Sequence, residues 1–214
     1  MIKIQCFTVN PLGENCYIAS DHTGEGVIID CGAFGDAEFQ LIADYVEKNG
    51  ILLKHALQTH MHFDHIFGLN HVFDRYGLRP ECHEEEEKTY EMNPQLAYDL
   101  CRVRLTLPEV ALGDRLCDNQ EITFGETVFK AIHTPGHTPG GLCFYCEAEG
   151  VLFSGDTLFQ GSVGRTDPPL GSWRKEIESV TRRILTLPDS TTIYPGHGDP
   201  TTVGYEKKYN PFLV

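Results

Sequence analysis

The chain has 214 residues, of which 41% are hydrophobic, and a formal net charge of −14 at pH 7. This length and composition allow a substantial buried core and suggest one large domain or two tightly packed halves. The acidic balance argues against a broad nucleic-acid or anionic-membrane surface. No stretch approaches the roughly 18 apolar residues of a membrane helix.

The N-terminal stretch "MIKIQCFTVNPLGENCYIAS" lacks the basic start, the long apolar run and the cleavage site of a signal peptide. We therefore expect a cytoplasmic protein. Of its eight cysteines, Cys6, Cys16, Cys31 and Cys143 lie in apolar strand-like runs, which predicts buried, reduced thiols. Cys143 and Cys146 have the C-x-x-C spacing. A strand directs these two side chains to opposite faces, which argues against a redox or zinc-ribbon role.

The first half of the chain begins with three strand-like runs, at residues 2–9, 15–20 and 26–32. A helix is expected over 35–50, with Asp36 as its N-cap and Gly50 past its end. A short buried strand follows at 55–60, and then a second helix within 65–77. The inward residues are expected to be Phe39, Leu41, Ile42, Tyr45 and Val46 in the first helix, and Ile66, Leu69, Val72, Phe73 and Tyr76 in the second.

A third helix is expected from about Glu84 to Leu100. It opens with the acidic run "EEEE", residues 84–87, which we interpret as a solvated face at a helix N-terminus.

The second half has the same organisation of strands followed by a helix. Residues 121–134 predict a hairpin around Gly125, and residues 140–156 predict another that turns near Gly150. A helix over 171–188 starts at Ser172 and ends at Pro188, and a last strand runs through 191–198. Two packed sheets with helices outside them account for this order. The sequence predicts an α+β protein with one domain over residues 1–214.

Residues that bind metals follow four of these strands. "THMHFDH" (residues 59–65) follows one strand and "HTPGHTPGG" (133–141) another. Asp156 and His197 follow two more, in "FSGDTL" and "YPGHGDP". Because buried strands hold such loops rigidly, this placement predicts a binding site at the strand ends.

The spacing of these residues suggests two metal ions. In an extended turn His60 and His62 point the same way and grip one ion, whereas Asp64 and His65 open the next helix and point toward a second position. Imidazole and carboxylate ligands suit zinc, with iron and manganese possible. Asp156 is the natural bridge between two ions roughly 3.5–4 Å apart. Spacing alone leaves open whether His133 or His137 is the further ligand. His22, His55, His71 and His83 are expected to be ordinary surface or core histidines.

Five motifs, "THMHFDH", "HTPGHTPGG", "FSGDTLF", "GRTD" and "PGHG", together resemble the metallo-β-lactamase fold superfamily. Within it, "GSVGRTD" and the tail "GYEKKYNPFL" resemble the single-domain glyoxalase II-like hydrolases. The resemblance implies an αββα sandwich of two mixed β-sheets with helices on the outer faces and metals at one edge. The helical domain that supplies much of the glutathione site in full-length glyoxalase II would begin about where this chain ends, so glutathione selectivity does not follow from the resemblance.

The resemblance also assigns roles to particular residues. One metal would be bound by His60, His62 and His137, the other by Asp64, His65 and His197, with Asp156 bridging. This favours His137 over His133, which would instead orient a ligand. Arg165 matches a basic position that helps to hold the thiol carrier. It would either bind a substrate carboxylate or pair with a nearby acid such as Asp167.

The expected activity is hydrolysis of a small α-hydroxyacyl thioester, such as S-lactoylglutathione, by a metal-bound hydroxide that Asp64 orients. The expected cofactors are two divalent ions, zinc first, with iron or manganese as alternatives. One rival is a persulfide dioxygenase with a single iron on His60, His137 and Asp156. Others are a lactonase, phosphodiesterase or β-lactamase of the same fold, and a non-enzymatic scaffold. We expect neither nucleic-acid nor membrane partners, and the sequence does not fix the oligomeric state.

Overall fold

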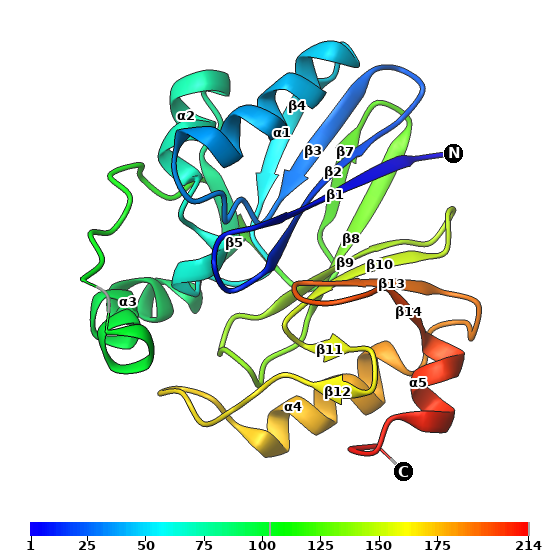
Figure 1. Ribbon diagram of the computed structural model, residues 1–214. Coiled ribbons are helices and arrows are strands. Elements are labelled where there is room, and N and C mark those ends of the chain that lie inside the picture. The colour runs from blue at the N-terminus through cyan, green and yellow to red at the C-terminus, as the bar shows by residue number, and fades with distance from the viewer. Residues whose placement is uncertain (103, 214) are drawn as a thin grey trace.

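The strands form two six-stranded mixed sheets and one two-stranded ribbon in the computed structural model, which describes residues 1–102 and 104–213 (Figure 1). The first sheet has the order β1-β2-β3-β4-β5-β6 and the second β14-β13-β10-β9-β8-β7, and the ribbon pairs β11 with β12. Helices α1 and α2 lie on the outer side of the first sheet, and α4 and α5 on the outer side of the second. The predicted αββα sandwich is confirmed.

The elements of the first sheet and its helices are β1 (Lys3–Val9), β2 (Glu14–Ser20), β3 (Glu25–Ile29), α1 (Asp36–Lys48), β4 (Leu52–Leu57), the 3-10 turn η1 (Phe63–His65), α2 (Leu69–Tyr76), β5 (Pro80–His83), α3 (Glu86–Cys101) and β6 (Arg115–Leu116). Those of the second are β7 (Glu121–Phe124), β8 (Thr127–His133), β9 (Leu142–Cys146), β10 (Val151–Gly155), β11 (Leu158–Phe159), β12 (Ser162–Val163), α4 (Trp173–Ser179), the π turn η2 (Val180–Ile184), β13 (Thr192–Pro195), β14 (Thr201–Thr202) and α5 (Val203–Tyr209).

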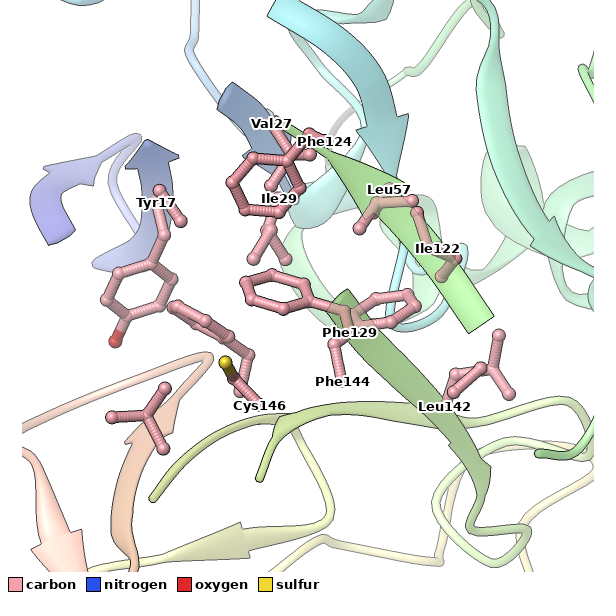
Figure 2. Close-up of a cluster of buried hydrophobic side chains, with 14 of the residues drawn as sticks. Tyr17, Val27, Ile29, Leu57, Ile122, Phe124, Phe129, Leu142, Phe144 and Cys146 are labelled. Atoms are coloured by element: carbon pink, nitrogen blue, oxygen red, sulfur yellow. The ribbon is translucent and has the colours of Figure 1, made fainter. Parts of the chain in front are cut away.

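The two sheets pack through a layer of aromatic and aliphatic side chains (Figure 2). Phe124, Phe129 and Phe144 of the second sheet meet Ile29 and Leu57 of the first, and all five are at most 1% exposed. Removing one such phenylalanine side chain typically costs about 3–5 kcal/mol. This layer therefore fixes how the sheets sit against each other, and with it where their strand ends meet.

The first two predicted helices are present as α1 and α2, but the predicted N-cap of α1 and two of the predicted buried residues are wrong. Asp36 is the first residue of α1, whose N-cap is Gly35. Leu41 is 63% exposed and Phe73 is 37% exposed, so neither belongs to the buried stripe. The buried positions of α1 are Phe39, Ile42, Ala43 and Val46. They follow the spacing of three and four residues that places side chains on one helix face, and Leu41 lies nearly opposite that face.

The cysteines are free thiols throughout the structure. Cys16, Cys31 and Cys143 are buried as predicted, whereas Cys6 is exposed, on the edge strand β1. Cys143 and Cys146 pack in different clusters on opposite faces of the second sheet, as the strand geometry predicts. Among the described helices, none has both the length and the apolar character needed to cross a bilayer.

Candidate metal centre

The predicted ligands converge because four strands end at the same edge of the sandwich. His60 follows β4, His137 follows β8, Asp156 follows β10 and His197 follows β13. Gly155, just before Asp156, has a φ of +50°, and a Cβ atom there would overlap the side chain of Thr59. Glycine alone allows the chain to turn this closely past β4.

In the described part of the chain, four groups of three side chains have ligand atoms that all lie within 4.8 Å of one another, and two of these groups consist of predicted ligands alone. One group is His60, His62 and His137, and the other is Asp64, His65 and His197. Asp156 lies between them. Its Oδ1 is 3.4 Å from Nε2 of His65, and its Oδ2 is 3.5 Å from Nε2 of His137 and 3.7 Å from that of His197. All seven predicted ligands therefore meet in one place, and their binding of metal stays a prediction.

Hydrogen bonds to the outer ring nitrogens fix how the histidines present their inner ones. Nδ1 of His137 donates to the carbonyl of Arg165 at 2.7 Å, and Nδ1 of His197 donates to that of Gly13 at 3.2 Å. A carbonyl oxygen only accepts, so in the neutral ring the lone pair is on Nε2. Both histidines thus have Nε2 available for a cation.

Asp30 orders two more of these rings. Its carboxylate accepts hydrogen bonds from the backbone N–H and the hydroxyl of Thr59, at 2.7 and 2.6 Å, and lies 3.2 Å from Nδ1 of His65. Because the Thr59 hydroxyl donates to Asp30, it can only accept from Nδ1 of His60, 3.1 Å away. Asp30 has a φ of +50°, a conformation that costs free energy and is typical of functional sites.

Several buried polar atoms of the centre match what a divalent cation requires. Nε2 of His60, Nε2 of His65 and Oδ1 of Asp156 find no hydrogen-bond partner in the described part of the chain. Without metal, Nδ1 of His62 donates a hydrogen bond to Nε2 of His137 at 2.8 Å, because the proton of His137 is on its Nδ1. Buried polar atoms without partners are costly, so we infer that this set of imidazoles and carboxylates fits metal ions.

The protonation states of the first ligand group agree with that fit. Burial lowers the pKa of His62 to about 3, and burial also lowers the pKa of His60 and of His137. These rings are neutral at physiological pH, as metal ligands must be.

Burial acts to raise the pKa of Asp156, but the neighbouring imidazoles, His65 first, hold it well below its usual value. Burial also acts to lower the pKa of His65 and of His197, but the carboxylates Asp156 and Asp64 raise both, that of His65 well above its ordinary value. A cation at the second group would therefore replace protons that these two rings hold in the metal-free protein.

A buried carboxylate on α3 holds two of the ligand loops. Oε2 of Glu86 accepts from the backbone N–H of Met61, between His60 and His62, and Oε1 accepts from that of Gly140, both at 2.8 Å. Asn93, two turns further along α3, donates to the carbonyl of Met61 at 2.7 Å. Glu86 is fully buried, so the prediction that the acidic run is a solvated face is wrong for this residue.

A second buried carboxylate acts on the loop of His137. Oε2 of Glu176, on α4, accepts from the backbone N–H of His137 at 2.7 Å. Burial raises the pKa of Glu176 to about 8, while hydrogen bonds from the backbone of His137 and Gly164 act in the opposite direction. The loop that carries His137 is thus bound by Glu86 from one side and Glu176 from the other.

His133 lies apart from the two ligand groups. Its Nε2 lies 3.0 Å from the carbonyl oxygen of Pro139 and closes the loop of residues 133–141. Its ring stacks on that of His83, with centroids 4.2 Å apart and an angle of 5° between the planes. Glu85 joins them in a further cluster of metal-type side chains. His133 thus supports the loop of His137 through the backbone.

A pocket of about 630 Å³ opens onto the centre. Its walls contain the ligands His62, Asp64, His137, Asp156 and His197, the apolar residues Leu12, Phe63, Leu96, Leu100, Phe159 and Val163, and also Cys101, Arg165, Pro168 and Gly198. Arg165 therefore lies where a substrate-binding residue was predicted. Its guanidinium is also paired with Asp167, the structural alternative that the sequence left open.

Comparison with known proteins identifies the family of this chain. A family model described as the metallo-beta-lactamase superfamily matches residues 9–197. Hydroxyacylglutathione hydrolase GloC of Haemophilus influenzae is 36% identical, over 99% of this chain and 98% of that protein. Two crystal structures are each 34% identical. BLEG-1, a B3 metallo-beta-lactamase, has a TM-score of 0.90 over 99% of this chain and 100% of that one. TTHA1623 in a di-iron-bound form has a TM-score of 0.83 over 98% and 100%. The chain therefore belongs to the metallo-β-lactamase superfamily.

Proposed function

We propose that the protein hydrolyses an α-hydroxyacyl thioester, such as S-lactoylglutathione, with two divalent cations. The observation that carries the proposal is the pair of complete ligand groups that share Asp156 and open onto one pocket. The relative from Haemophilus influenzae, named hydroxyacylglutathione hydrolase, supports the thioester class, because the match extends over nearly the whole of both chains.

The side chains of the centre have separable roles in this reaction. Two bound cations would supply a water of lowered pKa and a Lewis acid for the thioester carbonyl. Asp64 lines the pocket, with its Oδ2 3.2 Å from Nε2 of His197, and it accepts a hydrogen bond from the attacking water and orients it. The apolar walls exclude other water from the reacting carbonyl. The departing thiolate needs little proton assistance, because thiols are fairly acidic.

Zinc is our first proposal for the metal. The five imidazoles and two carboxylates of the centre suit zinc, iron and manganese alike. TTHA1623 is described with two irons, so loading by iron is the main alternative. The free cysteines support a reducing compartment, in line with the expected cytoplasmic location.

A persulfide dioxygenase with a single iron is less well supported. That reaction needs two histidines, one carboxylate and open positions for oxygen, which His60, His137 and Asp156 would supply. It gives no role to the second group of Asp64, His65 and His197, whose ligand atoms also lie within 4.8 Å of one another. The completeness of both groups therefore favours the hydrolase.

The proposal is tested on protein purified without added metal. We expect close to two metal ions per chain by mass spectrometry, and a kcat/KM for S-lactoylglutathione of about 10⁴ M⁻¹s⁻¹ or more, within the ordinary range for enzymes. Chelation is expected to abolish turnover and readdition of metal to restore it, with circular dichroism as a control for folding. Fully loaded protein that leaves thioesters intact but consumes oxygen with glutathione persulfide would contradict the proposal.

A further inference from the structure

The pocket has one cationic side chain within the described part of the chain, that of Arg165. The carbonyl of Arg165 accepts a hydrogen bond from Nδ1 of His137, so its backbone is fixed beside the metal ligands. Its side chain is 54% exposed and extends at the mouth of the pocket. An anionic group on a substrate would find its natural partner here.

Asp167 already forms an ion pair with the guanidinium of Arg165. Nε of Arg165 donates to Oδ1 of Asp167 at 2.8 Å, and Nη2 donates to Oδ2 at 2.5 Å. These two parallel hydrogen bonds occupy one edge of the guanidinium, an edge that could otherwise bind a substrate carboxylate through two hydrogen bonds. A carboxylate on the substrate must therefore displace Asp167 or approach it against like-charge repulsion.

Away from the two cations of the proposed function, no other side chain of the described lining compensates for this loss of positive charge. Its other charged residues in the described chain are the carboxylates Asp64 and Asp156. Six apolar side chains, contributed by the segment after β1, η1, α3, β11 and β12, form much of the remaining wall. The net charge of −14 adds a field that repels anions. The free part of the pocket is therefore suited to an uncharged, apolar group.

We propose that Asp167 sets the charge preference of this site by holding Arg165, so that the apolar wall binds the thiol-carrier side of the substrate. The inference rests on the proposed function and narrows its substrate class. Thioesters with an uncharged carrier are favoured, and carriers with carboxylates, glutathione among them, bind below the affinity that a free Arg165 would give.

The test compares two thioesters on metal-loaded protein, S-lactoylglutathione and the uncharged S-lactoyl-N-acetylcysteamine. Asp167→Asn is expected to raise the ratio of kcat/KM for the glutathione ester over the uncharged ester by about fivefold, through KM, as the upper range for an exposed ion pair predicts. Arg165→Met is expected to change the ratio less than twofold alone, but to remove the gain in the Asp167→Asn background. The control is Asp189→Asn, at another exposed aspartate paired with a cation, Lys207, which leaves the ratio unchanged.

An unchanged ratio in Asp167→Asn, or a gain that survives the loss of Arg165, overturns the inference. If the metal-loaded wild type cleaves neither thioester, the proposed function is wrong, and turnover cannot test the charge preference of the pocket. The affinity for glutathione, measured by calorimetry, then tests the role of Asp167. Tighter binding by Asp167→Asn than by wild type supports the role of Asp167, and equal binding overturns it.

Discussion

Asp156→Asn is expected to lower thioester hydrolysis by about 10³-fold and to lower the bound metal below two ions per chain. The carboxylate of Asp156 lies within 4 Å of members of both sets of ligands, namely His137 of the first and His65 and His197 of the second. An amide keeps the shape and removes the charge. It also turns an N–H₂ donor toward a region where cations would bind, so both ion positions lose affinity.

The measurement is metal content per chain together with kcat/KM, on apo protein reloaded with zinc. The exposed Asp189, replaced by asparagine, makes the same chemical change away from the pocket and controls for loss of charge. If Asp156→Asn kept two tightly bound ions and hydrolysed the thioester within tenfold of wild type, the bridging role would be wrong.

The seven clustered residues could be predicted from sequence because they share one simple signal. Each follows a strand of one of the two sheets, at most eight positions after its end, and strands of a sandwich end at common edges. Asp30 follows β3 in the same way and was missed, although the signal was present in "GVIIDCG". A single acid after a strand is common. Its significance appears only when Thr59 and His65 are seen against it.

Glu86 was missed for a different reason. Four consecutive glutamates look alike to any local pattern, and three of them are exposed. The helix period does distinguish them, since the buried positions Leu96 and Ala97, followed backwards through Asn93 and Thr89, lead to Glu86. Polar side chains along a buried stripe indicate buried hydrogen bonds. Which loops those bonds would hold depends on contacts between distant parts of the chain, and no local pattern contains that information.

The partner of Arg165 could not be predicted from any local sequence pattern. The sequence offered two partners for this guanidinium, a substrate carboxylate or Asp167 two residues away. Both partners are carboxylates, so the chemistry of the side chains does not choose between them. The choice depends on the geometry of the loop. The loop places the side chain at the pocket and in contact with Asp167 at once.

Glu86→Leu is expected to lower the free energy of unfolding of the metal-free protein by about 3 kcal/mol, as the loss of two hydrogen bonds to a buried charged group predicts. Leucine nearly preserves the volume and removes both acceptors, so the backbone N–H groups of Met61 and Gly140 are left buried without partners. Burial raises the pKa of Glu86. Part of the cost is therefore offset when the carboxyl group is removed, which keeps the expected loss below the sum of two such bonds.

The same substitution should weaken zinc binding by roughly 10–100-fold, because the loops that Glu86 holds carry His60, His62 and His137. Urea unfolding of the apo protein measures the first effect, and competition with a zinc chelator measures the second. Glu86→Gln keeps one acceptor and should fall between wild type and leucine, which gives a measurable variant if Glu86→Leu fails to fold. Glu84→Leu, at an exposed position of the same acidic run, is the matched control. Should Glu86→Leu unfold within 0.5 kcal/mol of that control and bind zinc equally well, the carboxylate would have no role in holding the centre.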